Sequence, residues 1–220
     1  LIVTKGEASM PHDRLAQQLS VQIKRIDEAG TAKRHERHIT GVLPPTDGKG
    51  PRYLLDGHGD KSFLRMNANN YLGLSLSAET IAADELATRQ FGTGPGAVRF
   101  ISGTYDAHVA LERKLAEFHG REAAMIFSSA YATIVSTIVP LVTADTVLIS
   151  DELNHNCIIN AMRLARPAGK GIYPHNDLDA LDRTLAEWKG KARRALVVTD
   201  GIFSMRGDHA QLDRISEICS

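Results

Sequence analysis

The sequence predicts an α/β fold in which a mostly parallel sheet is covered by helices on both faces. From residue 77 to the end, short apolar runs alternate with longer helical patterns, which is typical of parallel strands joined by crossover helices. The runs at 123–127, 146–150 and 195–199 are largely uninterrupted apolar stretches, as expected for strands buried on both faces. The composition, 43% hydrophobic and 24% charged over 220 residues, is that of a globular protein.

The charges balance, with 26 basic and 26 acidic side chains. Nucleic acids and anionic membranes attract an excess of Lys and Arg, so we expect neither as a partner. The longest apolar run, 133–142, contains Ser136 and Pro140 and is about half of a membrane span. Cys157 and Cys219 are the two cysteines and provide no disulfide framework. We therefore expect a cytoplasmic protein without an anchor or a signal peptide.

The N-terminal part is expected to contain a helix, an arm and a hairpin. Apolar residues at helical spacing predict an amphipathic helix over 11–29 that ends at Gly30. Residues 31–51 are rich in Gly, Pro and charged side chains, and within them 41–48 has the composition of a linker, so we expect a mobile arm. The short apolar runs 52–56 and 62–66 flank a turn and predict a β-hairpin.

The remaining elements alternate along the chain. Helices over 78–90 and 105–119 are predicted to end at Gly92 and Gly120, because glycine tolerates the left-handed conformation that closes a helix. A strand at 123–127, a helix from 130, a strand at 146–150 and a helix from 155 follow. We then expect a short strand at 171–173, a helix capped by Asn176, a strand at 195–199 and a helix from 211. The chain lacks an initial Met and stops within this last pattern, so we expect a fragment whose sheet is incomplete at the C-terminus.

Three loops that follow predicted strands carry polar residues: 128–131, 151–155 and 200–205. Ligands of open parallel sheets bind beyond the carboxyl ends of the strands, so these loops should share one edge. Ser129 opens a helix and could either help to bind a phosphate through nearby N–H groups or only cap the helix. His155 could stack on a planar ligand or act as a cap. His35 and His38 lie in a charged stretch without a third ligand nearby, and we expect no metal.

Several motifs together resemble the α-oxoamine synthases, a family of pyridoxal-phosphate (PLP) enzymes that join an amino acid to an acyl-CoA. The family includes glycine C-acetyltransferase, 8-amino-7-oxononanoate synthase, 5-aminolevulinate synthase and serine palmitoyltransferase. The resemblance extends over about 11–220, and the motifs that carry it are at 69–74, 98–104 with His108 and Glu112, 150–155, 175–177 and 199–205.

The resemblance implies a fold-type I homodimer with its active site between subunits. Residues 1–60 would be the N-terminal helix, the arm and the start of the hairpin, and 61–220 the first part of the PLP-binding large domain. The rest of that domain and a small C-terminal domain would be absent. By position, Ser129, Ala130 and Tyr131 would hold the cofactor phosphate, His155 would stack on the ring and act in catalysis, Ser204 would contact the phenolic oxygen, and Asn69 would lie near the amino acid.

The resemblance also implies what this stretch lacks. The family's Asp-Asp-Ser-His-Ala motif, which pairs with the pyridinium nitrogen, and its Schiff-base lysine correspond to positions after Ser220, so we expect the fragment alone to be inactive. Ile134 and Arg206 depart from the family pattern, and Arg206 reverses a charge near the cofactor. The motifs look most like glycine C-acetyltransferase, with glycine as the amino acid. A non-catalytic dimerising subunit, or another fold-type I enzyme such as an aminotransferase, remains an alternative.

Overall fold

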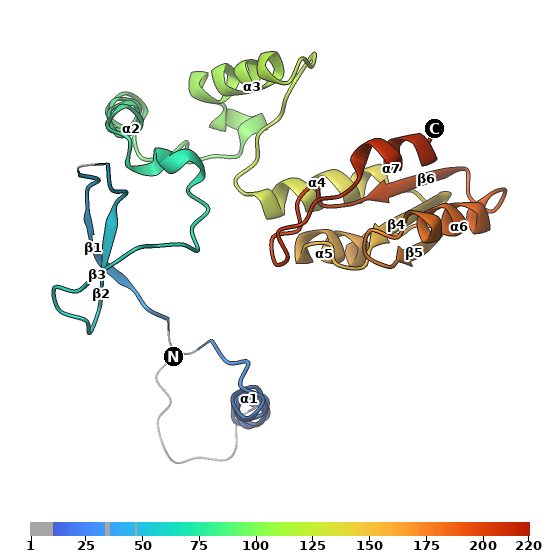
Figure 1. The fold of residues 1–220 in the computed structure, drawn as a ribbon, viewed down its shortest axis with the longest axis horizontal. Helices are drawn as coiled ribbons and strands as arrows, with labels where there is room; N and C mark the ends of the chain where they lie inside the picture. Colours follow the sequence, from blue (N-terminus) through green and yellow to red (C-terminus); the bar gives the residue numbers. More distant parts are fainter. Residues whose placement is uncertain (1–10, 34–35, 47) are drawn as a thin grey trace. The chain divides into compact units, whose positions relative to one another are not determined.

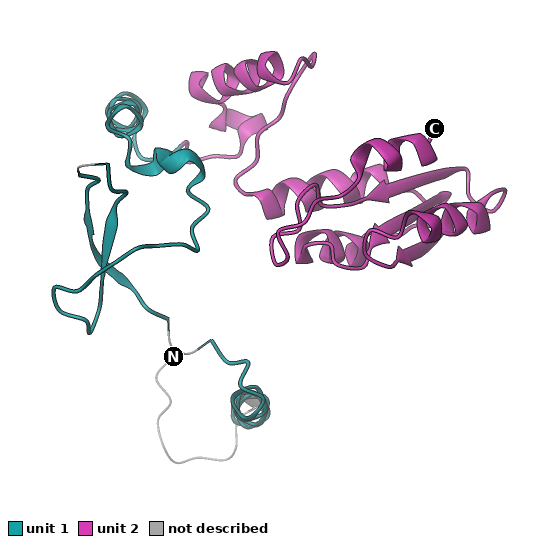
Figure 2. Ribbon diagram, viewed as in Figure 1, with its two compact units in different colours: residues 1–94 teal, residues 95–220 magenta. Residues whose placement is uncertain are grey.

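The computed structural model describes residues 11–33, 36–46 and 48–220. The opening run 1–5 and His35 lie outside the described residues. The chain forms two compact units, residues 1–94 and 95–220 (Figure 2). Figure 1 shows the order of the elements along the chain, and each unit is described by itself.

The first unit contains helix α1 (Pro11–Glu28), as the apolar spacing predicts, and a small antiparallel sheet. Strands β2 (Arg52–Leu55) and β3 (Ser62–Phe63) form the predicted hairpin. The prediction of a linker at 41–48 was wrong for residues 41–43, because β1 (Ile39–Leu43) pairs with β2 and places Val42 opposite Tyr53. Its β-branched and leucine side chains suit a strand, although the neighbouring Gly and Pro residues make the segment look like a linker.

A 3-10 helix, η1 (Tyr71–Leu76), and helix α2 (Ala78–Phe91) complete the first unit. Ser77 caps α2 by accepting a hydrogen bond from the Thr80 N–H at 3.5 Å. Gly92 ends the helix with φ of 83°, a conformation that glycine adopts without strain. The predicted bounds of this helix are confirmed to within one residue.

The second unit begins with a π-helical turn, η2 (Arg99–Gly103), and helix α3 (Asp106–Phe118). The Glu112 carboxylate accepts two hydrogen bonds from Arg99, at 2.5 and 3.0 Å, and a third from the Ile126 N–H at 3.0 Å. The predicted strand at 123–127 is wrong, because no part of this run is a strand. Its Ile126 N–H bonds a carboxylate instead of a neighbouring strand, and a β-strand requires such a neighbour.

The second unit contains a three-stranded parallel sheet with the order β5-β4-β6. Strand β4 (Thr146–Asp151) is central and fully buried, and β5 (Gly169–Tyr173) and β6 (Arg194–Val198) flank it. The pairing brings the ends of β4 and β6 together, with Ser150 opposite Val198. The parallel sheet predicted from the alternation of elements is therefore confirmed for these strands.

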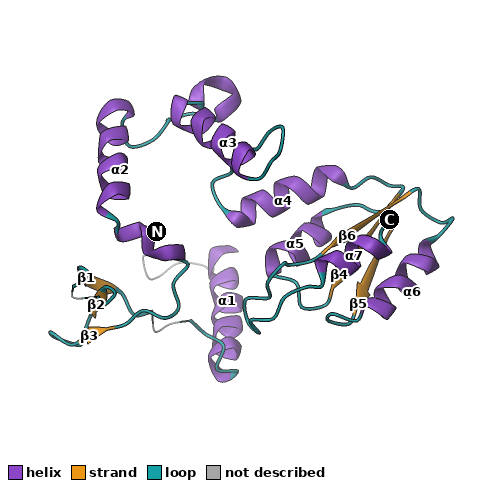
Figure 3. Ribbon diagram, turned by 45° about the horizontal axis from the view of Figure 1, so that its top comes forward, coloured by secondary structure: helices purple, strands orange, loops and turns teal. Residues whose placement is uncertain are grey.

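Helices cover both faces of this sheet (Figure 3). Helices α4 (Ala130–Leu141) and α5 (Asn156–Leu164) pack on the face that carries Leu148. Helices α6 (Leu178–Trp188) and α7 (Leu212–Ile218) pack on the face that carries Val147 and Ile149. Successive side chains of a strand point to opposite faces, so one central strand contributes to two apolar layers.

Glycine allows α6 to approach the edge strand β5. A Cβ atom on Gly169 would lie 1.9 Å from a ring carbon of Trp188, and one on Gly171 would lie 2.6 Å from the Thr184 methyl group. Both distances are far shorter than van der Waals contact. Any larger residue at 169 would force the indole ring to move.

The cap of α6 differs from the prediction. Asp177, not Asn176, caps the helix, and its carboxylate accepts a hydrogen bond from the Ala180 N–H at 2.8 Å. Asn176 instead has φ of 56°, which asparagine tolerates better than most residues. Both are good capping types, so the sequence alone does not separate neighbouring candidates.

Of the helices in the described part of the chain, none is both long enough and apolar enough to cross a bilayer.

Candidate functional site

The loops after β4 and β6 meet at the carboxyl edge of the parallel sheet, as the sequence predicts. Asn154, in the loop after β4, is 4% exposed and uses its whole amide group. Its Nδ2 donates to Ser150 Oγ and to the Val198 carbonyl, each at 2.8 Å, and its Oδ1 accepts from the Asp200 N–H at 2.7 Å. Two loops 46 residues apart in sequence are thereby fixed to each other.

Sequence reasoning assigned Asn154 no role. Its place beside His155 within the 150–155 motif is the one signal that could have singled it out. The hydrogen-bond partners of the Asn154 amide depend on the pairing of β4 with β6. Strand pairing is a property of the fold, and the local sequence does not predict it. Asn154 is therefore a residue that holds the site together.

His155 is fixed at the start of α5 by two contacts. Its backbone N–H donates to the Asp200 carboxylate at 2.6 Å, and its Nδ1 accepts from the Cys157 N–H at 3.3 Å. The side chain is thus the N-cap of α5, so the capping interpretation of His155 is correct. With Nδ1 as an acceptor, the ring proton of the neutral imidazole lies on Nε2. Burial raises the pKa of the adjacent Cys157 thiol, which stays protonated.

A cavity of about 470 Å³ lies against this edge, and His155 and Ser204 both line it. Residues from the loop after β4 form one wall, and the turn after β6, with Phe203, Ser204 and Arg206, forms another. The volume falls in the range of small-molecule sites. The structure therefore brings together two of the residues predicted to contact one planar ligand.

Ser129, Ala130 and Tyr131 lie at the start of α4 and are exposed. Ser129 Oγ accepts from the Ala132 N–H at 3.1 Å, so Ser129 caps the helix, as the alternative interpretation predicts. The Tyr131 hydroxyl accepts from the Asn160 side chain at 3.0 Å, and Asn160 belongs to the helix that His155 caps. These residues do not line the cavity, but this bond ties the start of α4 to α5.

Asn69 lies in the first unit, in an exposed segment just before η1. Asn69 thus belongs to a different unit from His155 and Ser204. Its neighbour Asn70 holds η1 in shape, since the Asn70 side chain accepts from the Ser75 N–H at 3.0 Å. A role for Asn69 near an amino acid stays a prediction.

A second polar cluster, absent from the sequence predictions, lies at the same edge. His175 follows β5, and its ring nitrogens lie 3.0 Å from Asp151 Oδ1 and 3.0 Å from Asp208 Oδ2. The hydrogen bond with Asp208, together with Asp151, raises the pKa of His175. His175 in turn lowers the pKa of Asp208, with help from Arg206 at 3.1 Å. The His175–Asn176–Asp177 motif was noted, but its partners are distant in sequence.

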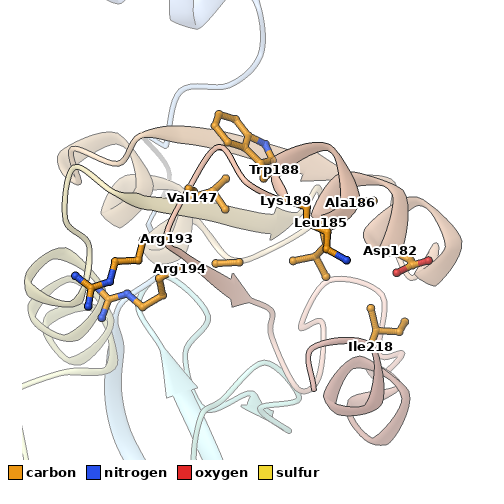
Figure 4. A pocket seen from close by; sticks show the side chains of 11 residues that line it. Val147, Asp182, Leu185, Ala186, Trp188, Lys189, Arg193, Arg194 and Ile218 are labelled. Atoms are coloured by element: carbon orange, nitrogen blue, oxygen red, sulfur yellow. The ribbon is translucent and has the colours of Figure 1, made fainter.

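Another cavity of about 350 Å³ lies at the opposite end of the strands, where β4 and β6 begin (Figure 4). Val147, Trp188 and the basic side chains of Arg193 and Arg194 line it. Ligands of open parallel sheets bind at the carboxyl edge, so this cavity is a weaker candidate. In the described part of the chain, no group of three or more His, Cys, Asp or Glu side chains is placed to hold a metal ion.

Comparison with curated proteins gives close relatives along most of the chain. The 8-amino-7-oxononanoate synthase of Thermoanaerobacter pseudethanolicus is 43% identical over 182 residues, which are 83% of this chain and 44% of that protein. That of Geobacter sulfurreducens is 45% identical over 164 residues, 74% of this chain and 41% of that protein. The chain thus spans less than half the length of these relatives.

Solved structures lead to the same group of proteins. Serine palmitoyltransferase from Sphingomonas wittichii superposes with a TM-score of 0.78 at 26% identity, covering 96% of this chain and 50% of that one. The S. paucimobilis enzyme, solved with a bound PLP–myriocin aldimine, gives 0.78 at 25% identity, covering 91% and 48%. The fold is therefore that of the fold-type I transferases. The profile of the family "aminotransferase class I and II" matches residues 61–220, and the chain belongs to this family, within its α-oxoamine synthase branch.

Proposed function

We propose that this chain is part of a PLP-dependent acyltransferase that condenses an amino acid with an acyl-CoA, giving an α-amino ketone and releasing CoA and usually CO2. The observation that carries the proposal is the shared cavity of His155 and Ser204 at the carboxyl edge of the sheet. Its relatives are named as synthases of 8-amino-7-oxononanoate, which is itself an α-amino ketone.

The residues present fit the parts of PLP. The His155 ring, held by its cap and by Asp200, would lie against the flat pyridine ring. Ser204 would donate its hydroxyl hydrogen to the phenolic oxygen. The first N–H groups of α4, at Ala130 and Tyr131, have no acceptor within the helix and would bind the phosphate beside Ser129. When bound, PLP supplies an electron sink for a carbanion at the amino acid's α-carbon.

This chain's own residues would bind and orient the cofactor, but they would not complete the reaction. None of the described residues lining the cavity is a lysine, so we propose that residues 1–220 alone do not catalyse. His155 carries its free ring proton on Nε2, and we propose that it can hold or donate this proton near the reacting carbon. Asn69 of the first unit is proposed to contact the amino acid. The motifs favour glycine and a short acyl donor such as acetyl-CoA.

The first experiment is a titration of the chain with PLP, followed by protein fluorescence from Trp188. We expect saturable binding that is weakened in Ser204→Ala and unchanged in Ser136→Ala, a matched control on the exposed surface of α4. A chain of the full length of the relatives that contains residues 1–220 should absorb visible light and release CoA thiol from acetyl-CoA when glycine is added. Absence of PLP binding in both chains would contradict the proposal.

The same assay separates the alternatives. An aminotransferase would bind PLP and convert a 2-oxo acid without releasing CoA. A non-catalytic subunit would form dimers but show neither reaction, and the downstream codons would lack the expected lysine. Comparing acetyl-CoA with longer acyl-CoA donors, and glycine with alanine and serine, would identify the substrates.

We also propose that the protein acts as a cytoplasmic homodimer. In support, Leu15, Leu19, Ile23 and Ile26 of α1 form a stripe in which each side chain is 46–53% exposed. Contiguous apolar surface of this kind is typical of an interaction face. Light scattering of the unsubstituted protein should give twice the mass of one chain. The double variant Leu19→Glu, Ile23→Glu should give the mass of a single chain. If the unsubstituted protein has the mass of a single chain, the proposal is contradicted.

A further inference from the structure

The turn that carries Ser204 closes on itself through the backbone. The Phe203 N–H donates to the Asp208 carbonyl at 2.9 Å, and the Gly207 and Arg206 N–H groups donate to the Phe203 carbonyl at 2.7 and 3.1 Å. Ser204 is therefore part of a compact turn, residues 203–208, that its own backbone hydrogen bonds close. What holds this turn to the sheet decides where the Ser204 hydroxyl lies.

His175 links this turn to the rest of the edge. Its Nε2 faces Asp208 at 3.0 Å, and its ring packs edge-on against Phe203 with 4.3 Å between centroids. On its other side, Nδ1 faces the buried Asp151 carboxylate, which also accepts from the Leu153 and Asn176 N–H groups at 2.8 and 2.9 Å. One imidazole thus joins the end of β4 to the segments that follow β5 and β6.

The geometry favours a charged histidine. Ionised carboxylates only accept hydrogen bonds, so an imidazole that bonds two of them donates from both nitrogens; the Asn176 side-chain amide also lies 3.3 Å from Nε2. The groups that face His175 are Asp151 at the end of β4 and Glu152 just after it, Asp208 and Arg206 in the turn, and Tyr173 at the end of β5. Glu152 accepts from the His175 backbone N–H at 3.0 Å. Tyr173 stays neutral because burial and Asp151 raise its pKa to about 12.

We infer that His175, as an imidazolium, is a positioning residue that holds the 203–208 turn against the sheet and so places Ser204 for the cofactor. This inference rests on the proposed function. It makes ligand affinity depend on a residue that touches no ligand. Below the folded-state pKa of His175, which lies above its ordinary value of about 6.5, the link is complete. As pH rises through that pKa, one carboxylate loses its donor and the turn loosens.

The test begins with ring nitrogen and backbone NMR shifts of the unsubstituted chain between pH 5 and 9. We expect both ring nitrogens of His175 to be protonated at pH 7, with a midpoint above about 6.5, and the Ser204 amide signal to move with the same midpoint. Asp208→Asn should lower that midpoint. A neutral His175 at pH 7, or a Ser204 signal that ignores its titration, would overturn the inference.

The second measurement is PLP affinity at pH 6.5 and 8.5 in His175→Gln and in His209→Gln. His209 is the matched control because it lies next to the same turn with an exposed side chain. His175→Gln should bind PLP roughly ten-fold more weakly at pH 6.5, the effect of leaving one buried partner unpaired, and should lose the decline towards pH 8.5. Equal affinity in the two variants would overturn the inference. If no variant and no unsubstituted chain binds PLP, the proposed function fails, while the NMR measurement still decides the role of His175.

Discussion

The Asn154 side chain accepts a hydrogen bond from the Asp200 backbone N–H at 2.7 Å, and the Asp200 carboxylate in turn accepts from the His155 N–H at 2.6 Å. These reciprocal bonds join the loops after β4 and β6 at the point where the cavity begins. The position of the His155 ring therefore depends on the buried Asn154 amide, which lines the same cavity.

Asn154→Ala should lower the free energy of unfolding by about 2–3 kcal/mol, because it leaves the partly buried Asp200 N–H and Val198 carbonyl without the Asn154 amide as a partner. Asn156→Ala, an exposed neighbour at the start of α5, should change it by less than about 0.5 kcal/mol. Urea unfolding followed by circular dichroism measures both. Equal stabilities in the two variants would show that Asn154 does not hold the loops.

His155 has two separable contributions, a cap and a ring. His155→Ala should cost about 1 kcal/mol of stability through the lost cap and should also weaken PLP binding. His155→Asn keeps a good capping residue, so it should retain the stability and still bind PLP roughly five-fold more weakly, since aromatic stacking contributes about 1 kcal/mol. Thermal unfolding and PLP titration of both variants check this. Unchanged PLP affinity in both would leave His155 a cap alone.

Glu112 should control the acid stability of the segment before α4. Arg99 and the Ile126 N–H lower the pKa of Glu112 to about 2. A carboxylate with a depressed folded-state pKa stabilises the fold above its unfolded-state pKa of about 4.3, and this contribution is lost as pH falls towards about 2. The urea concentration at the unfolding midpoint should therefore decrease as the pH is lowered from about 4.3 to about 2. Glu112→Gln should be less stable at pH 6 and should show a smaller decline. Parallel pH profiles in the two proteins would contradict this.

Gly169→Ala should lower the free energy of unfolding by about 2 kcal/mol, the usual cost of overpacking, because the new methyl group would overlap the Trp188 ring. Gly50→Ala is the control, since nothing lies within 4 Å of its Cβ position. Trp188→Leu in the Gly169→Ala background should recover part of the loss, because contacting residues are not additive. Chemical unfolding of the unsubstituted protein, of Gly169→Ala, of Trp188→Leu and of the double variant measures the coupling. Strictly additive losses of stability would argue against direct contact.

The sequence predicts the helices and the parallel strands well because their apolar patterns reflect burial directly. Val147, Leu148 and Ile149 form a run that only a strand covered on both faces would need, and the structure places them in two apolar layers. The run 123–127 is as apolar as a strand, but strand formation depends on a hydrogen-bonding neighbour, and the pattern of one segment does not report its neighbour.

The candidate site was predicted only in part. His155 and Ser204 lie in the loops that follow β4 and β6, so the order of the elements along the chain predicts that they lie at the carboxyl edge of the sheet. The bonds of Asn154 with Val198, and of His175 with Asp208, join residues 44 and 33 positions apart. Those contacts depend on the order of the strands in the sheet and on the paths of the loops. The spacing of residues within one segment predicts neither.

The rim that surrounds the cavity is already cross-linked by its own hydrogen bonds, through Asn154 on one side and His175 on the other. A ligand that enters such a rim does not have to immobilise the loops, so it loses little free energy to conformational entropy. Recognition would then be rapid and close to lock-and-key. The loops joined through Asn154 and through His175 would keep nearly the same shape before and after the ligand binds.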